Sequence, residues 1–306
     1  MATHARRPLL GYAMVWAAAT LFAVNGTVSK IVLTSGVSSL RLAQLRSTGA
    51  LVGLALVAAL LTRARLRLTR RELPSLVLFG IAGLAFVQLF YFVAIRRLPV
   101  GIALLIQYLA PLLVALWARY GMREPVGRRI WLALSLALVG LALVVQVWNG
   151  LELDALGIAA SLGAAVTLAL YILLAERAVG RRDPITLSLY GFLFASLFWL
   201  VVQPPWSFPA GSFGEDVSLL GNLATTELPV WALTGWLVVL GTIAPFGLVA
   251  GALRHIPATR VAIVAMLEPV LATLVAYLWL AESLEPLELA GGAVVLAGIL
   301  VAQTAR

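Results

Sequence analysis

The sequence contains the segment AIRRLP at residues 94–99 and a second version of it, ALRHIP, at residues 252–257. The same gapless shift of 158 residues matches three further pairs: Pro111 with Pro269, Glu124 with Glu282, and Gly140 with Gly298. Leucine and alanine coincide often by chance in an apolar chain, but arginine, proline, glutamate and glycine in one register do not. We therefore predict an internal repeat, with a first half at residues 1–150 and a second half at residues 151–306.

The composition excludes a soluble protein. Hydrophobic residues fill 62% of the 306 positions and charged residues only 11%, against about 25% in ordinary soluble domains. The mean hydropathy is +1.02. A soluble chain of this size needs a charged surface that so few ionisable side chains cannot cover. We therefore expect a polytopic membrane protein and exclude soluble enzymes and disordered proteins.

Intervals without charged residues set the number of membrane crossings, because a spanning helix needs about 20 largely apolar residues. They predict ten helices, at residues 9–32, 38–62, 73–95, 99–119, 129–148, 155–177, 184–203, 229–252, 258–279 and 286–304. The first apolar run is longer than the core of a signal peptide, so we expect it to remain as a helix. The long connection at 203–228, rich in proline and glycine, is expected to be an irregular external loop.

The basic residues predict the orientation of these helices. With the N-terminus in the cytoplasm, 17 of the 22 Lys and Arg residues fall on inner segments and 5 on outer ones, as the positive-inside rule requires. Ten crossings then place both termini on the cytoplasmic side. Each half has five crossings, an odd number, so the two halves insert in opposite orientations. Inverted repeats are typical of secondary transporters that bind substrate near the membrane midplane; the alternative is a duplication that only built a helical bundle.

Two runs of the sequence resemble a known family. They read Leu109-Ala-Pro111 with Glu124 and Gly140, and Leu267-Glu-Pro269 with Glu282 and Gly298. A proline-bearing fourth helix, a following glutamate and a glycine-bearing fifth helix are similar to the EamA-type repeats of the drug/metabolite transporter superfamily. The resemblance covers nearly the whole chain, and within the superfamily the chain is most similar to aromatic amino acid exporters of the YddG type.

This resemblance implies an all-α membrane protein with ten transmembrane helices in two inverted five-helix repeats. It also implies export of small metabolites, most often amino acids, without ATP. The expected location is the inner (cytoplasmic) membrane of a bacterial cell, where the partners are the lipid bilayer and a small-molecule substrate.

Glu268 is the outstanding candidate for a functional residue. It lies near the middle of the ninth predicted helix, with no other charged residue between positions 261 and 281. A charged side chain at that depth costs about 2.5–3.5 kcal/mol on insertion scales. One interpretation is a proton carrier or an anchor for the amine of a substrate. The other is a polar contact that satisfies backbone groups freed at the Pro269 break.

Polar and aromatic residues in the middle of other helices are candidates for the lining of a central cavity. Gln88 and Tyr91 are three positions apart and share one helical face. The full candidate set for substrate binding is Trp16, Asn25, Gln88, Tyr91, Gln107, Tyr108, Tyr171, Phe246 and Glu268. The alternative interpretation is that the aromatic residues lie at the membrane interface and the glutamines join neighbouring helices.

Three prolines inside predicted helices, at positions 111, 245 and 269, each remove a backbone hydrogen bond and bend the helix. We expect Pro111, Pro245 and Pro269 to mark a central cavity, or else to be ordinary packing kinks. Arg46 lies in the second helix, about a turn and a half from its outer end. It is expected to extend toward the membrane surface, or to face an outer vestibule.

The motifs of other functional classes are absent from the sequence. There is no cysteine and no phosphate-binding loop, and the two histidines, His4 and His255, cannot form a metal triad. We expect no cofactor, no catalytic residues and no nucleic-acid partner. A membrane transferase that uses Glu268 as a base, and a channel or scaffold subunit without alternating access, remain as alternatives to a transporter.

Overall fold

The computed structural model describes residues 7–61, 68–95, 97–98, 100–145, 154–179, 182–204, 206, 210–281 and 285–304. The predicted boundary between the halves, at residue 150, lies outside these residues. Within them, nine helical stretches are long and apolar enough to cross a membrane. A tenth, α7 (Arg128–Val145), packs along α15 (Pro286–Thr304). The chain is therefore an all-α membrane protein with ten long helical stretches, close to the predicted positions.

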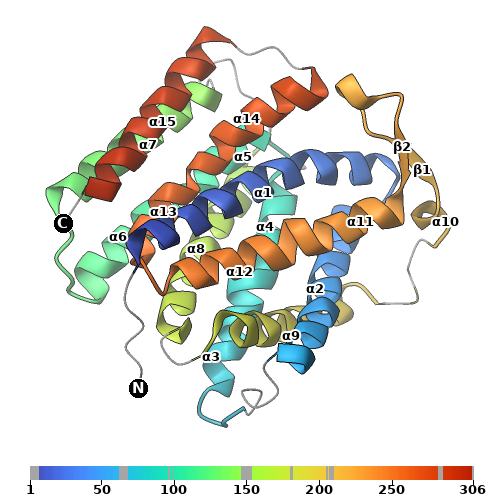
Figure 1. The fold of residues 1–306 in the computed structure, drawn as a ribbon, viewed down its shortest axis with the longest axis horizontal. Coiled ribbons are helices and arrows are strands. Elements are labelled where there is room, and N and C mark those ends of the chain that lie inside the picture. The colour runs from blue at the N-terminus through green and yellow to red at the C-terminus, as the bar shows by residue number, and fades with distance from the viewer. Residues whose placement is uncertain are drawn as a thin grey trace.

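The first half of the chain forms α1 (Pro8–Thr34), α2 (Ser39–Leu61), α3 (Leu73–Leu78), α4 (Phe86–Ile95), α5 (Val100–Gln107), α6 (Ala110–Leu116) and α7. The second half forms α8 (Ala155–Val179), α9 (Pro184–Val202), α11 (Val230–Val238), α12 (Ala244–Ala252), α13 (Ala258–Ala265), α14 (Leu267–Leu280) and α15. In Figure 1 these helices form a bundle in which α1 begins and α15 ends on the same side of the molecule.

Several membrane-length stretches are interrupted rather than continuous. A π-helical segment at Phe79–Ala85 joins α3 to α4, and a second at Val239–Ile243 joins α11 to α12. The α5–α6 stretch breaks at residues 108–109, and the α13–α14 stretch breaks at residue 266. Each predicted proline lies just after such an irregularity, at the second or third position of the helix that follows, where its missing N–H is tolerated.

The contact between α7 and α15 repeats itself under the 158-residue shift. A Cβ atom added at Gly140 would lie 2.7 Å from the Gly291 carbonyl oxygen and 2.6 Å from the Val295 nitrogen. A Cβ atom at Gly298 would lie 2.8 Å from the Ala133 carbonyl oxygen and 3.0 Å from the Ala137 nitrogen. The second set of contacts is the first set with each residue replaced by its repeat partner, as a two-fold relation between the halves requires.

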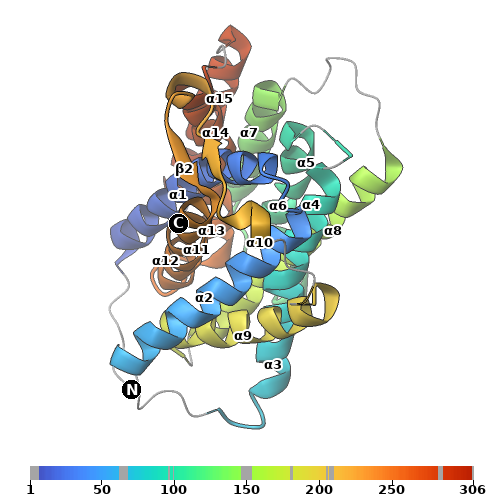
Figure 2. The same ribbon diagram turned by 90° about the vertical axis from the view of Figure 1, so that its right-hand side faces the viewer.

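Helices of the first half pack directly against helices of the second half. Besides the α7–α15 pair at the upper left of Figure 1, α2 of the first half packs on α9 of the second half. Figure 2 shows these two helices crossing on the other side of the molecule. Because both pairs join corresponding helices of the repeats, the interface between the halves runs through the whole bundle.

The connection after α9 has more structure than the sequence indicates. It contains α10 (Ala210–Phe213) and two short antiparallel strands, β1 (Asp216–Ser218) and β2 (Glu227–Pro229). The side chain of Trp279 donates a hydrogen bond to the Leu219 carbonyl at 2.9 Å, and Asn222 donates to the Leu278 carbonyl at 3.0 Å. The prediction of an irregular loop here is therefore wrong for residues 210–229, because contacts with the end of α14 hold the hairpin in place.

The segments predicted on the inner side contact one another at one end of the bundle, which we call the inner end. Arg182, before α9, forms an ion pair with Glu72, before α3, at 2.7 Å. The guanidinium of Arg254, after α12, donates to the Arg182 carbonyl at 3.0 Å, and Arg129 donates to the Thr304 carbonyl at 3.1 Å. The first contacts join the end of α12 to the starts of α3 and α9, and the last joins the end of α15 to the start of α7.

Replacing Glu72 by glutamine is expected to lower the stability of the folded protein at pH 7 by about 1 kcal/mol, the range of a partly exposed pair. Hydrogen bonds from Arg182 and Thr69 lower the pKa of Glu72 from 4.5 to about 2. The pair therefore contributes fully above pH 4.5, and its contribution falls as the pH drops toward 2. In detergent at pH 7, 5 and 3.5, the difference in unfolding temperature between the variant and wild type should narrow on acidification. The control is Glu124→Gln at an exposed position, which should show no such difference.

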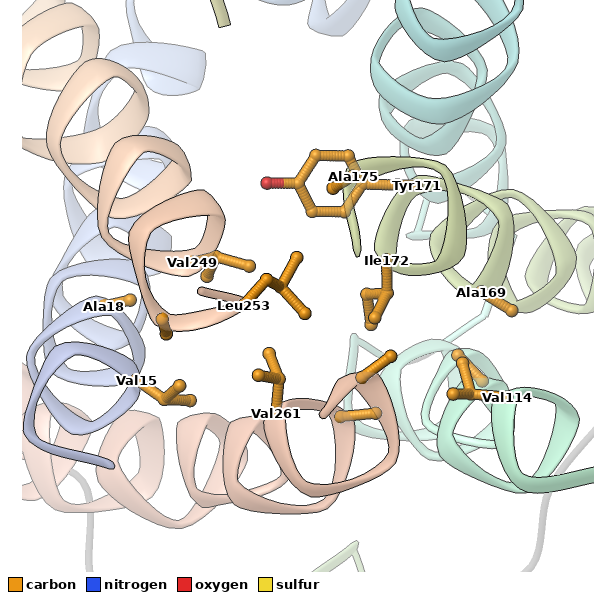
Figure 3. Packing of buried hydrophobic residues seen from close by; sticks show 14 of the residues in the cluster. Val15, Ala18, Val114, Ala169, Tyr171, Ile172, Ala175, Val249, Leu253 and Val261 are labelled. Carbon is orange, nitrogen blue, oxygen red and sulfur yellow. The ribbon is translucent and has the colours of Figure 1, made fainter. Parts of the chain in front are cut away.

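Apolar side chains close the space between the helices near the inner end. Figure 3 shows Val249 of α12 and Leu253, which follows it, facing Ile172 of α8, above Val261 of α13. Further buried members of this cluster are Val15, Ala18, Val114, Ala169 and Ala175. These residues are contributed by five different stretches from both halves, so packed apolar side chains join the halves near this end.

Candidate functional site

The two broken helices meet in the interior of the bundle. Tyr108 occupies the break between α5 and α6, and Glu268 lies in the first turn of α14, directly after the other break. The Tyr108 hydroxyl donates a hydrogen bond to Glu268 Oε2 at 2.6 Å. Pro111 and Pro269 lie next to these breaks, where the backbone leaves the regular helix. The structure therefore joins four of the predicted residues at the contact between the two halves.

Arg46 of α2 is buried beside the π-helical segment Val239–Ile243, which precedes Pro245. Pro245 has no N–H, so the Gly241 carbonyl, four residues earlier, lacks its usual helical partner. The Arg46 guanidinium donates to this carbonyl at 2.9 Å and to the Thr242 hydroxyl at 3.0 Å. Only 7% of Arg46 is exposed. The prediction that Arg46 extends to the surface or an outer vestibule is therefore wrong, because the freed backbone acceptor holds it in the interior.

Asn25 and Gln88 flank this arginine. Asn25 lies directly against Gly241, where only a glycine leaves room for its side chain. Gln88 donates to the Leu84 carbonyl at 3.3 Å and lies 3.5 Å from the hydroxyl of Ser47, the neighbour of Arg46. We call Asn25, Arg46, Gln88, Tyr91, Tyr108 and Glu268 the polar cluster; Tyr91 lies within electrostatic range of both Arg46 and Glu268.

Several polar atoms around the cluster have no partner. Among the described residues, the side-chain oxygens Oδ1 of Asn25, Oε1 of Gln88 and Oε1 of Gln107 are buried without a hydrogen bond. Buried polar atoms are normally satisfied, so such a group is a strong sign of a ligand or ordered water. Tyr91, Gln107 and Glu268 are only partly buried, whereas Asn25, Arg46, Gln88 and Tyr108 are fully buried.

An aromatic cluster adjoins the polar cluster. It consists of Phe22, Phe79, Tyr171, Phe192 and Phe246. Tyr171 stacks on Phe79 with ring centroids 5.5 Å apart, and packs edge-on against Phe246 at 5.3 Å. Phe246 also packs edge-on against Phe22 and Phe192. The predicted residues Tyr171 and Phe246 are therefore neighbours, and their rings form an apolar wall.

The polar and aromatic clusters occupy related positions in the two halves. Gly83 of the first π-helical segment packs on Tyr171, and Gly241, its repeat partner, packs on Asn25. Tyr171 and Asn25 are thus corresponding residues, each placed by the first helix of one half against the third helix of the other. The shift of 158 residues also pairs Gln88 with Phe246. The repeat fixes the positions, and the side chains give them different chemistry.

Trp16 does not belong to either cluster. It is 39% exposed on α1, and its carbonyl accepts a hydrogen bond from Thr20. The predicted set for substrate binding did not include Arg46, Thr242 or Phe192. The freed carbonyl four residues before Pro245 indicates that a donor is needed there, but not which residue supplies it. No comparable signal marks Phe192, because a phenylalanine in an apolar helix is unremarkable by itself.

The arrangement can bind a small amphipathic solute but lacks the groups of a hydrolase or metal centre. It offers a guanidinium, a carboxyl group, phenol and amide groups, and a wall of aromatic rings. In the described part of the chain, no group of three or more His, Asp or Glu side chains is placed to hold a metal ion. The candidate site therefore brings polar, charged and aromatic side chains of both halves together in the interior of the bundle.

Comparison with known proteins identifies similar chains. The sequence model of the EamA-like transporter family matches twice, at residues 9–146 and 155–304. The threonine/homoserine exporter RhtA of Escherichia coli (strain K12) is 29% identical over 273 residues, 89% of this chain and 82% of that protein. An uncharacterized transporter of Archaeoglobus fulgidus is 29% identical over 230 residues, 75% of this chain and 77% of that one.

A third relative, the uncharacterized transporter YdfC of Bacillus subtilis, is 26% identical over 246 residues, 80% of this chain and 75% of its own. A solved crystal structure superimposes with a TM-score of 0.75 and covers 97% of both chains at 20% identity, which shows a shared fold. The family model describes transporters, so the prediction that this chain is not an enzyme is confirmed and the transferase alternative is wrong.

Proposed function

Because this chain belongs to the EamA-like transporter family, we propose that it exports small amino acids by alternating access at the polar cluster. The single observation that carries this proposal is the hydrogen bond between Tyr108 and Glu268. It joins two broken helices, one from each half, inside the bundle. Secondary transporters place their substrate sites at such breaks, because backbone that is not helical is tolerated only around a cavity or binding site.

The proposed orientation follows the charges and the loop contacts. Both termini lie in the cytoplasm of a bacterial cell, the first half ends and the second begins near residue 150, and the halves insert in opposite directions. The ion pair of Glu72 with Arg182 and the grouping of basic loops at the inner end support this arrangement. The self-complementary glycine contacts of α7 and α15 support the inverted relation. The apolar closure of the inner end corresponds to a state closed toward the cytoplasm.

The proposed substrate class is supported by the relatives and by the site. Relatives that cover most of the chain include exporters of threonine and homoserine. The polar cluster offers groups of both charges, as an amino acid requires. The aromatic cluster fits the narrower resemblance to aromatic amino acid exporters, which we keep as an alternative within the same class.

Flux measurements on purified protein in proteoliposomes test the proposal. Labelled threonine, homoserine, phenylalanine, a purine and a sugar are compared at two pH values, with protein-free liposomes as the control. Saturable flux of an amino acid without added partners is the expected result. Linear flux without saturation would indicate a channel, and no flux of any probe from a folded, monodisperse preparation would contradict transport by this chain alone.

A further inference from the structure

Two opposite charges lie in the membrane interior without touching each other. Arg46 and Glu268 are within electrostatic range, yet among the described residues neither forms an ion pair with the other or with any further charged side chain. Arg46 bonds to the neutral Gly241 carbonyl and Thr242 hydroxyl, and Glu268 to the neutral Tyr108 hydroxyl. Each group is held in place by neutral partners, and neither forms an ion pair with a described side chain.

Burial of an ionised Arg46 and an ionised Glu268 without an ion pair is unfavourable unless a group of opposite charge binds to each of them. A buried charge that lacks a counter-charge destabilises a protein far more than a paired one, and the effect is stronger inside a membrane. The repeat does not require these residues, because the position that corresponds to Glu268 in the first half is Ala110. The two charges are therefore special features of this site rather than elements of the fold.

We propose that Arg46 and Glu268 are the two ends of a zwitterion site, in which Arg46 binds the α-carboxylate and Glu268 the α-ammonium group of the transported amino acid. The inference rests on the proposed function and specifies its substrate chemistry. A guanidinium has five N–H donors, and the contacts with Gly241 and Thr242 leave others free for a carboxylate. Such a carboxylate pairs well with the planar guanidinium in two-point geometry.

The unsatisfied oxygens on the arginine side of the cluster offer acceptors for donors of the bound amino acid. Asn25 Oδ1 and Gln88 Oε1 are acceptors without donors, and both residues lie beside the helices that hold Arg46 and Gly241. An ammonium group, or a hydroxyl on the substrate side chain, supplies the missing donors. Tyr91 interacts electrostatically with both Arg46 and Glu268 and is half-buried beside them.

The test compares three probes that differ only in their charged groups: threonine, threonine amide without the carboxylate, and 2,3-dihydroxybutanoate without the ammonium group. In wild-type proteoliposomes, threonine amide and the dihydroxy acid should compete with labelled threonine about tenfold less well or worse, the range of a lost charged hydrogen bond. If wild type prefers another amino acid, the probes are that amino acid, its amide, and the 2-hydroxy acid that lacks its ammonium group.

The Arg46→Gln variant should lose the preference for threonine over threonine amide by about tenfold or more, because glutamine keeps an N–H donor but carries no charge to pair with a carboxylate. The matched control is Arg41→Gln on the same helix, whose guanidinium donates to the Pro204 carbonyl near the outer end; it should keep the wild-type preference. Equal competition by all three probes in wild type, or an unchanged preference in a folded Arg46→Gln protein, overturns the zwitterion site. Absence of amino acid flux in wild type instead overturns the proposed function.

Discussion

Replacing Glu268 by glutamine is expected to reduce amino acid flux driven by a pH gradient by about tenfold or more, while the protein remains folded. The carboxyl group is the single acidic side chain between positions 261 and 281, and it accepts the Tyr108 hydroxyl across the two broken helices. A carboxylate in this place can hold a proton or the ammonium group of a substrate, but not both at once. In the proposed function, exchange of the two would couple proton entry to amino acid exit.

Proteoliposomes with an imposed pH gradient, compared with the same vesicles after the gradient is collapsed, measure this coupling. The residual flux of Glu268→Gln should be the same in both conditions. Glu288→Gln serves as the control, because Glu288 lies in the first turn of α15 and accepts a hydrogen bond from the exposed Glu285 nitrogen. A Glu268→Gln protein that retains the full response to the gradient would remove the proton-carrier role from this residue.

Replacing Gly291 by alanine is expected to destabilise the folded protein by about 1–3 kcal/mol, the typical penalty of overpacking. An added Cβ would lie 2.6 Å from the Gly140 carbonyl oxygen and 2.7 Å from the Val144 nitrogen. Both are backbone atoms, so the contact is relieved only if α7 and α15 move apart along their whole length. Thermal unfolding in detergent should therefore show a midpoint several degrees below that of wild type.

Gly235→Ala is the matched control for this variant. Gly235 also lies within a helix, but a Cβ atom there has no neighbouring atom within 4 Å. Because alanine favours a helix over glycine by about 0.5–1 kcal/mol, this change should leave the unfolding temperature unchanged or raise it. Equal destabilisation by both changes would mean that close packing of α7 on α15 is not the cause.

The membrane-crossing stretches could be predicted from the sequence with good accuracy. Lipid offers no hydrogen-bond partners, so each apolar interval must satisfy its backbone internally and become a helix. The predicted stretch at 286–304 is identical to α15, and that at 258–279 ends within one residue of α14. Proline also predicted the breaks at residues 108–109 and 266, which lie within three residues of Pro111 and Pro269.

Other features depend on contacts between residues far apart in the chain and could not be predicted. The inward direction of Arg46 depends on the Gly241 carbonyl, 195 positions away. The hairpin at 216–229 depends on Trp279 and Asn222, which connect it to α14. Trp16 faces outward although its residue type suits either surface or cavity. In each case the residue type permits two environments, and only the packing of the helices selects one.

The close glycine contacts of α7 with α15 also determine where movement between the halves is easiest. The backbones of the two helices approach closely at Gly140, Gly291 and Gly298, and such tight packing resists sliding and separation. If the halves move as proposed, we expect this line to act as a hinge at one edge of the molecule. The α2–α9 pair lies toward the opposite edge (Figure 1), and a small angular change at the hinge produces its largest displacement there. Probes attached to α2 and α9 would consequently report the switching motion with far greater amplitude than probes attached to α7 and α15.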